Sequence, residues 1–302
     1  MATQRDVRNR IGSIKNIQKI TRALETVAAA RLRRAEQRIT ALRPYADAIR
    51  RMTRQAARAA GAEAARLPLL KEHESERTVA LLLITGDRGL AGGFNSQIIR
   101  AGTRRSDELA EAQRQLAWYA AGRRGVSSLT FRGRELSGQY TGFTDRPAYA
   151  DARTIADDLM SAYVDGTLDR VELIFNSYVS PLVQRVRSET LLPLSQATIA
   201  GEEDEAEAGD EAARATPALV EYEPEPERLL RRLVPDYVEI SIYRALLESA
   251  AGFYGAQMTA MRSASDNAGE IITDLTLQMN RVRQAEITQE IMEVVAGAEG
   301  LS

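Results

Sequence analysis

The sequence offers few side chains for chemistry, and the most suggestive feature is a glycine-rich segment. Residues 84–95, ITGDRGLAGGFN, follow an apolar run and contain Gly86, Gly89, Gly92 and Gly93. Turns of this composition can hold a phosphate group through their backbone N–H groups. However, the segment lacks the Lys and hydroxyl of a Walker loop, and its glycine spacing differs from the dinucleotide fingerprint. We therefore favour a structural turn in which the backbone packs closely.

Other reactive side chains are scarce. The chain has no cysteine, which excludes disulfides, thiolate metal sites and thiol nucleophiles. His73 is the single histidine and lies among charged residues in KEHESER. We expect it to be a solvated loop residue, because no second histidine exists to share a metal or a proton. The sequence therefore argues against a metal site and against acid/base catalysis by histidine.

The two ends of the chain carry the clearest structural pattern. Apolar residues recur there in steps of three and four, as on one narrow stripe of a helix, which favours a coiled-coil seam. The first stripe comprises Val7, Ile11, Ile14, Ile17, Leu24, Val27 or Ala28, Leu32, Ala35, Ile39 and Leu42. The second comprises Met261, Ala264, Ala268, Ile272, Leu275, Met279 and Val282, followed by Ile287, Ile291 and Val294. Two helices of matching length predict an intrachain antiparallel coiled coil, with a kink or a relieved turn at Pro44.

Between these helices the pattern changes to short apolar runs that alternate with helical stretches. Residues 78–85, 115–121 and 171–178 read as buried strands of a mostly parallel sheet, and 181–194 as an added edge strand. The predicted fold class is α/β, with a long antiparallel coiled coil of the terminal helices and a central Rossmann-like domain. The expected divisions are a coiled-coil helix at 1–60, an α/β domain at 75–198, an acidic flexible loop at 199–220 and a coiled-coil helix at 226–302.

Charge is distributed unevenly along the chain. Residues 1–60 hold 15 Arg or Lys and 4 Asp or Glu, whereas residues 201–228 hold 11 acidic and 2 basic residues. This asymmetry predicts two different neighbours. The apolar run at 78–85 is far shorter than the roughly 20 residues of a membrane span. The N-terminus lacks the apolar region of a secretory signal, so we expect a cytoplasmic protein.

The basic N-terminal helix leaves a nucleic-acid-binding coiled coil as an alternative. Its candidate phosphate contacts are Arg5, Arg8, Arg10, Lys15, Lys19, Arg22, Arg31, Arg33 and Arg34. Acidic residues interrupt this charge, and no aromatic residue that could stack on a base precedes Tyr45. A protein partner with acidic side chains would serve the charge equally well. A third alternative, a nucleotide-binding enzyme, would need the glycine-rich segment to bind nucleotide.

Four segments together resemble the gamma subunit of F-type ATP synthases. They are IGSIKNIQKITRALETVAAARLRRAEQRI, GDRGLAGGFN, YEPEPERLL and MRSASDNAGEIITDLTLQMNRVRQAEITQEIMEVVAGA, and they cover nearly the whole chain. The resemblance implies the central rotor shaft of a proton-translocating complex at the cytoplasmic face of a bacterial plasma membrane. It also implies that this chain is not itself an enzyme and has no catalytic residue, no metal and no cofactor. Its partners would be the alpha and beta subunits, the epsilon subunit and the c-subunit ring. The chain would bind no nucleic acid and would meet the membrane only through the complex.

The resemblance also implies roles for particular residues. Arg283, Gln284 and Thr288 match the family's polar cluster that hydrogen-bonds a beta-subunit loop. Leu24 matches a position close to the acidic lever of beta, and Tyr222 and Glu223 match residues at the interface with the membrane rotor ring. To these we add Arg33 and Arg34 as contacts to the catalytic ring, on the physical ground of their charge.

Overall fold

The computed structural model describes residues 3–73, 75–194 and 225–299. They divide into two compact units. One combines residues of Met1–Ala30 and Gln257–Ser302, and the other comprises Arg31–Ala256. Two long helices, α1 (Gln4–Ala60) and α6 (Pro226–Glu299), contribute to both units. The acidic loop predicted at 199–220 lies outside the described residues.

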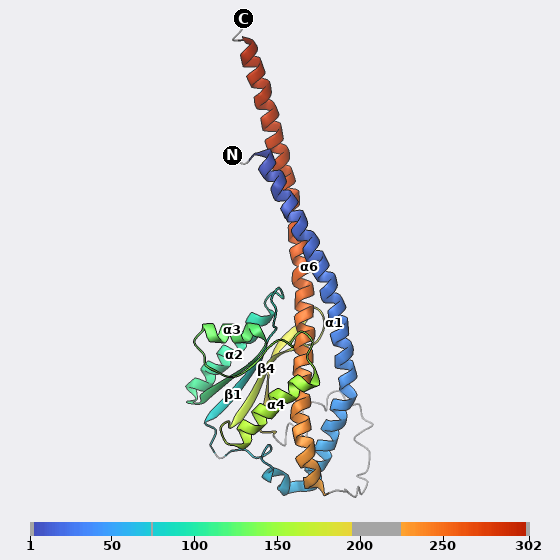
Figure 1. The fold of residues 1–302 in the computed structure, drawn as a ribbon, viewed down its shortest axis with the longest axis vertical. Helices are drawn as coiled ribbons and strands as arrows, with labels where there is room; N and C mark the ends of the chain where they lie inside the picture. The colour runs from blue at the N-terminus through green and yellow to red at the C-terminus, as the bar shows by residue number, and fades with distance from the viewer. Residues whose placement is uncertain (1–2, 74, 195–224, 300–302) are drawn as a thin grey trace. The chain divides into compact units, whose positions relative to one another are not determined.

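The first unit is an antiparallel pair formed by the start of α1 and the end of α6 (Figure 1). Three hydrogen bonds show that the pair is antiparallel. They join Gln4 to Glu286, Gln18 to Ser265 and Glu25 to Arg262, so residue numbers rise along one helix while they fall along the other. The buried seam residues are Val7, Ile11, Thr21 and Ala28 on α1, and Met261, Ser265 and Ala268 on α6. The small seam residues let the two backbones approach closely.

The second unit contains a five-stranded sheet in the order β3-β2-β1-β4-β5. Its strands are β1 (Thr78–Ile84), β2 (Gln115–Ala121), β3 (Leu136–Tyr140), β4 (Arg170–Tyr178) and β5 (Gln184–Leu192). The first four strands pair in parallel, and β5 pairs antiparallel to β4. Strands β1 and β4 are almost wholly buried, as expected of central parallel strands that are covered on both faces.

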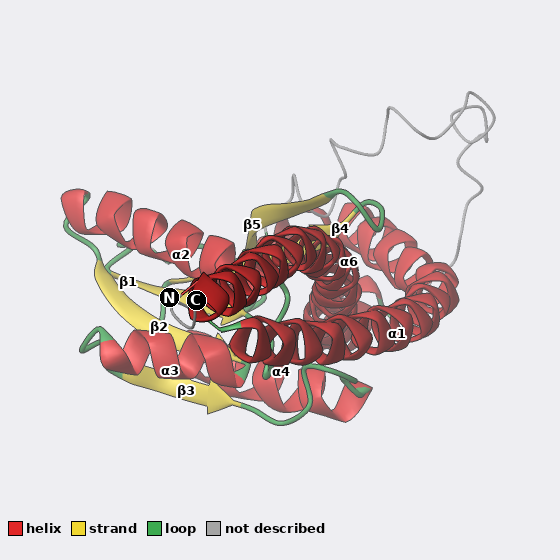
Figure 2. Cartoon of the chain, turned by 90° about the horizontal axis from the view of Figure 1, so that it is seen from above, coloured by secondary structure: helices red, strands yellow, loops and turns green. Residues whose placement is uncertain are grey.

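Three helices connect the strands: α2 (Phe94–Glu111), α3 (Arg123–Phe131) and α4 (Tyr149–Val164). Helices α2 and α4 lie on opposite sides of the sheet (Figure 2). Alternate β1 residues, among them Leu82 and Ile84, enter the main core with Leu159 of α4 and Leu246 of α6. On the other face Gly102 of α2 lies directly against Leu83. A short 3-10 helix, η1 (Gly61–Arg66), follows α1.

Two sequence-based expectations need correction. The edge strand expected within 181–194 is present as β5, but β3 was not anticipated. Pro44 lies inside α1, which continues to Ala60. The terminal helices are also unequal, with 57 residues in α1 and 74 in α6.

Candidate partner-binding surfaces

The helix pair of the first unit buries a stripe of α1 that differs from the predicted one. Its positions follow alternating steps of four and three: Val7, Ile11, Ile14, Gln18, Thr21, Glu25 and Ala28, each of which is buried or half-buried. Ile17, which we expected in this seam, is instead 53% exposed. The prediction considered only apolar residues and therefore placed Ile17 in the seam. The structure has the polar residues Gln18 and Thr21 in the seam instead.

The displaced apolar residues form a second stripe on α1. Ile17, Ile20 and Val27 are 53%, 58% and 47% exposed, and Leu24 between them is half-buried. Their spacing of three, four and three residues puts them on one face of the helix. Large apolar side chains aligned on a solvent-exposed face mark an interaction surface. The predicted contact Leu24 therefore belongs to an apolar stripe that extends over three turns.

The end of α6 presents the predicted polar cluster to solvent. Arg283, Gln284 and Thr288 are all exposed. The hydroxyl of Thr288 donates a hydrogen bond to the backbone carbonyl of Gln284 at 2.9 Å, so its oxygen remains an acceptor while its proton is held within the helix. Among the described residues, the side chains of Arg283 and Gln284 have no hydrogen-bond partner, which leaves both groups able to bind another chain.

The same stretch of α6 is also apolar. Its exposed apolar residues are Ile287, Ile291, Met292 and Val294. The backbone N–H of Gln4 approaches the Glu286 carboxylate at 3.4 Å, which places the start of α1 beside Glu286. Helix α6 then continues to Glu299. The part of α6 that extends past the start of α1 therefore carries exposed Ile, Met and Val side chains. Such a helix end needs an apolar environment to cover it.

The other predicted contact residues are less informative. Arg33 and Arg34 are exposed and belong to the second unit. Two other arginines of α1, Arg31 and Arg38, are engaged within the chain, so the basic residues of α1 do not form one free patch. Arg31 lies over the ring of Tyr254, and Arg38 donates to the carbonyl of Pro147 and to the hydroxyl of Tyr243. Tyr222 and Glu223 lie outside the described residues.

The glycine-rich segment begins directly after β1 and is held by its own side chains. Asp87 accepts hydrogen bonds from the backbone N–H groups of Arg123, Gly142 and Thr144 and from the Thr144 hydroxyl. Burial raises the pKa of the Asp87 carboxyl, but these donors outweigh it and hold the pKa below its ordinary value.

Two backbone donors of this segment are likewise engaged. The N–H of Gly86 bonds to the Asn95 side chain at 2.8 Å, and the N–H of Asp87 bonds to the Thr144 hydroxyl at 2.8 Å. A phosphate cradle requires such N–H groups to point at a ligand. The geometry therefore supports the structural turn that the sequence favoured.

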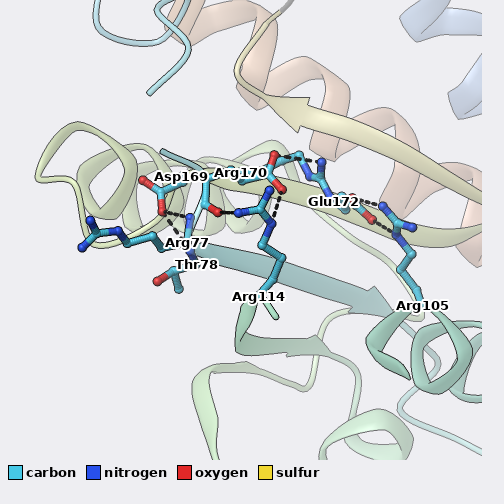
Figure 3. Close-up of polar contacts among 8 residues, drawn as sticks. Arg77, Thr78, Arg105, Arg114, Asp169, Arg170 and Glu172 are labelled. Atoms are coloured by element: carbon cyan, nitrogen blue, oxygen red, sulfur yellow. Dashed lines mark hydrogen bonds and ion pairs between the residues drawn. The ribbon is translucent and has the colours of Figure 1, made fainter. Parts of the chain in front are cut away.

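His73 contradicts its predicted role as a solvated loop residue. Its Nδ1 lies 2.8 Å from Oδ1 of Asp169, and its ring stacks on Tyr163 at 4.6 Å between centroids. The second oxygen of Asp169 accepts the backbone N–H groups of Arg77 and Thr78 at the start of β1 (Figure 3). Through these contacts, the His73 imidazole links the segment that precedes β1 to the segment that precedes β4. Sequence reasoning missed it because the partner is distant in the chain.

A second polar cluster lies near the first one, around the residues that begin strands β1 and β4. Glu172 of β4 is 3% exposed and receives Arg105 of α2 at 2.8 Å and Arg170 at 2.8 Å (Figure 3). Arg170 also pairs with Glu76 at 2.9 Å, which Arg114 contacts in turn. The hydrogen bonding that Arg105 donates to Glu172 is the largest cause that raises the pKa of Arg105. Each of these charged side chains has at least one partner of opposite charge, so we interpret the cluster as a structural one that fixes α2 to the sheet.

Two classes of site are absent from the part of the chain that the structure describes. No group of three or more Asp, Glu or His side chains could hold a metal ion there. Across residues 3–73, 75–194 and 225–299, no helix combines the length and the apolar character that a membrane crossing requires. What the described residues do present is a class of surface made of exposed apolar and polar helical faces, which is typical of proteins that bind other chains.

Comparison with known proteins agrees with this class. The family model described as ATP synthase matches residues 3–301. The ATP synthase gamma chain of Rubrobacter xylanophilus is 43% identical over 303 residues, covering 100% of this chain and 99% of the relative. That of Anaeromyxobacter sp. is 42% identical over 302 residues, with full coverage of both chains. The chain belongs to the ATP synthase gamma-chain family, whose members are non-catalytic subunits.

Solved structures show the same fold. A chain in the Euglena gracilis mitochondrial ATP synthase, in its OSCP/F1/c-ring part, matches with a TM-score of 0.67 at 14% identity, covering 99% of this chain and 94% of that one. A chain from the central stalk and c-ring of the Tetrahymena thermophila mitochondrial ATP synthase matches with a TM-score of 0.58 at 25% identity, covering 82% and 99%.

Proposed function

We propose that this chain is the rotating shaft that couples turning of a membrane ring to conformational change at catalytic beta subunits. The observation that carries the proposal is the exposed stripe of Ile17, Ile20, Leu24 and Val27 on a paired helix. A pair of helices is asymmetric about its own axis. It can therefore present a different face to each of three surrounding sites and bias each one toward a different affinity.

The proposed partners are those that the family resemblance implies, and the exposed surfaces of α1 and α6 support part of this assignment. The stripe with Leu24, together with Arg33 and Arg34, would face the ring of alpha and beta subunits. Arg283, Gln284 and Thr288 would bind a loop of beta, with guanidinium and amide groups suited to carboxylates and backbone carbonyls. The apolar end of α6 would be covered by the same ring. Tyr222 and Glu223 would contact the c-subunit ring, with the epsilon subunit against the α/β domain.

The proposal also includes the location of the complex and the role of each segment of the chain. The complex would lie at the cytoplasmic face of a bacterial plasma membrane, and this chain would meet the membrane only through its partners. The helical segments 1–60 and 226–302 would form the shaft, and the domain at 75–198 would form its foot. The acidic loop at 199–220 would be a flexible surface segment.

The test is co-expression of the chain with cognate alpha and beta subunits, followed by gel filtration and an ATPase assay. We expect one complex with strong ATP hydrolysis, and a loss of hydrolysis when the residues after Asn280 are deleted. Elution of the chain alone, while alpha and beta assemble without it, would overturn the proposal. A steep salt dependence of DNA affinity in that case would favour the nucleic-acid-binding alternative.

A further inference from the structure

A groove between α2 and α3 carries a concentration of positive charge that the shaft does not use. Its volume is about 440 Å³, and it is lined by Ser96, Ile99, Arg100, Thr103, Arg104, Asp107, Ser128 and Arg132. Arg100 and Arg104 are one turn apart on α2, and Arg132 directly follows α3. Three guanidinium groups from two helices therefore surround one concave volume, opposed by a single carboxylate.

These three arginines differ from their neighbour Arg105. Arg105 is held by Glu172 at 2.8 Å and by Glu108 at 2.7 Å. By contrast, the side chains of Arg100, Arg104 and Arg132 are exposed and have no ion pair or hydrogen bond to any described residue. Three guanidinium charges against one carboxylate, Asp107, leave a net positive potential in the groove that attracts an anion.

The other polar groups narrow the chemistry of the ligand. The hydroxyls of Ser96 and Thr103 donate to the backbone carbonyls of Gly93 and Ile99, both at 2.9 Å, so their protons are engaged. Among the described residues, the hydroxyl of Ser128 has no such partner, which leaves it as a donor beside the guanidinium groups. A ligand here needs several acceptor oxygens and a multiple negative charge.

We propose that this groove binds the phosphate groups of a small polyanion, either a free polyphosphate or the triphosphate part of a nucleotide. Guanidinium groups match phosphate oxygens with paired hydrogen bonds and keep their charge at every physiological pH. The volume lies within the range of small-molecule sites, roughly 300–1,000 Å³. The groove is distinct from the glycine-rich turn, whose Gly86 and Asp87 donors are engaged.

Calorimetric titration of the full chain tests the proposal, with inorganic tripolyphosphate and magnesium-free ATP as separate probes. We expect tripolyphosphate to bind, and Arg100→Gln, Arg104→Gln and Arg132→Gln each to weaken its affinity about tenfold. Tighter binding of ATP would assign the nucleotide as ligand, and equal affinity would assign the phosphate chain alone. Circular dichroism checks that each variant folds, which these exposed changes should permit.

The matched control is Arg185→Gln, which removes the same charge from an exposed arginine on the edge strand β5. It should change the affinity less than about twofold. The proposal is overturned if neither probe binds, or if Arg185→Gln weakens binding as much as the groove variants do, since non-specific charge attraction would then suffice. Binding of polyglutamate in place of both phosphate probes would also overturn it, and would assign the groove to an acidic protein segment.

Discussion

The side-chain amide of Gln18 donates a hydrogen bond to the backbone carbonyl of Ser265 across the helix pair, at 3.2 Å. A polar residue at a seam position fixes the register of a coiled coil at some cost in stability. Gly269 reinforces this relationship, because a Cβ at that position would lie 3.2 Å from the Gln18 amide nitrogen. The seam therefore specifies how the two helices align as well as whether they associate.

Close approach of the helices predicts the effect of enlarging Ala28, a fully buried seam residue. Ala28→Leu should destabilise the full chain by about 1–3 kcal/mol, because the added atoms have no space. Thermal unfolding followed by circular dichroism measures the effect. The control is Ala29→Leu at the adjacent exposed position, which should change stability by less than about 0.5 kcal/mol. Equal melting temperatures for the two variants would contradict the assigned seam.

The turn after β2 depends on Gly122. Its φ is +102°, and a Cβ there would lie 2.2 Å from the carbonyl oxygen of Thr85. Gly122→Ala should cost about 3 kcal/mol or more in the free energy of unfolding, measured with urea. Gly133→Ala is the matched control, since its φ of +72° is also positive but nothing lies within 4 Å. That variant should cost only about 1–2 kcal/mol, and a reversed order would refute the steric argument.

Asp87 predicts a pH dependence of stability. Its folded pKa is lowered, so it stabilises the chain above its unfolded pKa of about 3.9, and this contribution is lost as the pH falls through the folded pKa. Asp87→Asn should lose about 1–2 kcal/mol at pH 7, allowing for solvent screening. This difference from the unaltered chain should shrink below about pH 4.

The measurement is the free energy of unfolding between pH 3 and pH 7. Asp47→Asn on the exposed face of α1 serves as the control and should follow the unaltered chain throughout. A constant difference between Asp87→Asn and the unaltered chain at every pH would show that the carboxylate charge is not what holds the turn.

Leu24 tests the proposed coupling function. A charge at Leu24→Lys, on the apolar stripe, should impair proton pumping by the assembled complex more than ATP hydrolysis. Thr26→Lys places the same charge on an exposed position of the helix outside the stripe and should leave the ratio of pumping to hydrolysis unchanged. If pumping and hydrolysis fall in equal proportion in Leu24→Lys, the stripe has no specific part in coupling.

The sequence predicts the terminal helices and four of the five strands because their periodicities are long or strongly apolar. Strand β3 escaped because its five residues, Leu136–Tyr140, include a glycine and have no buried run. Strand β3 forms because its neighbour β2 supplies hydrogen-bond partners. The strand propensity of its own residues gives no information about that neighbour.

The candidate surface was predictable only in part. Leu24, Arg283, Gln284 and Thr288 are accessible side chains on the helices where the sequence put them. Ile17 was assigned to the wrong face because a search for apolar residues passes over Gln18 and Thr21, whereas strict alternation of three and four residues finds them. His73 and Asp169 are 96 residues apart, so no local pattern could reveal their contact.

The pairing of the first residues with the last has a consequence for biosynthesis. Residues 1–30 leave the ribosome early, but their partner segment begins at Gln257. At about 5–20 residues per second, the nascent α1 waits roughly ten to fifty seconds before its partner helix is made. During that interval Val7, Ile11 and Ala28 have no seam to enter, and the growing chain presents them together with Ile17 and Ile20. The early helix therefore exposes an apolar segment of the kind that chaperones bind until its partner helix is made.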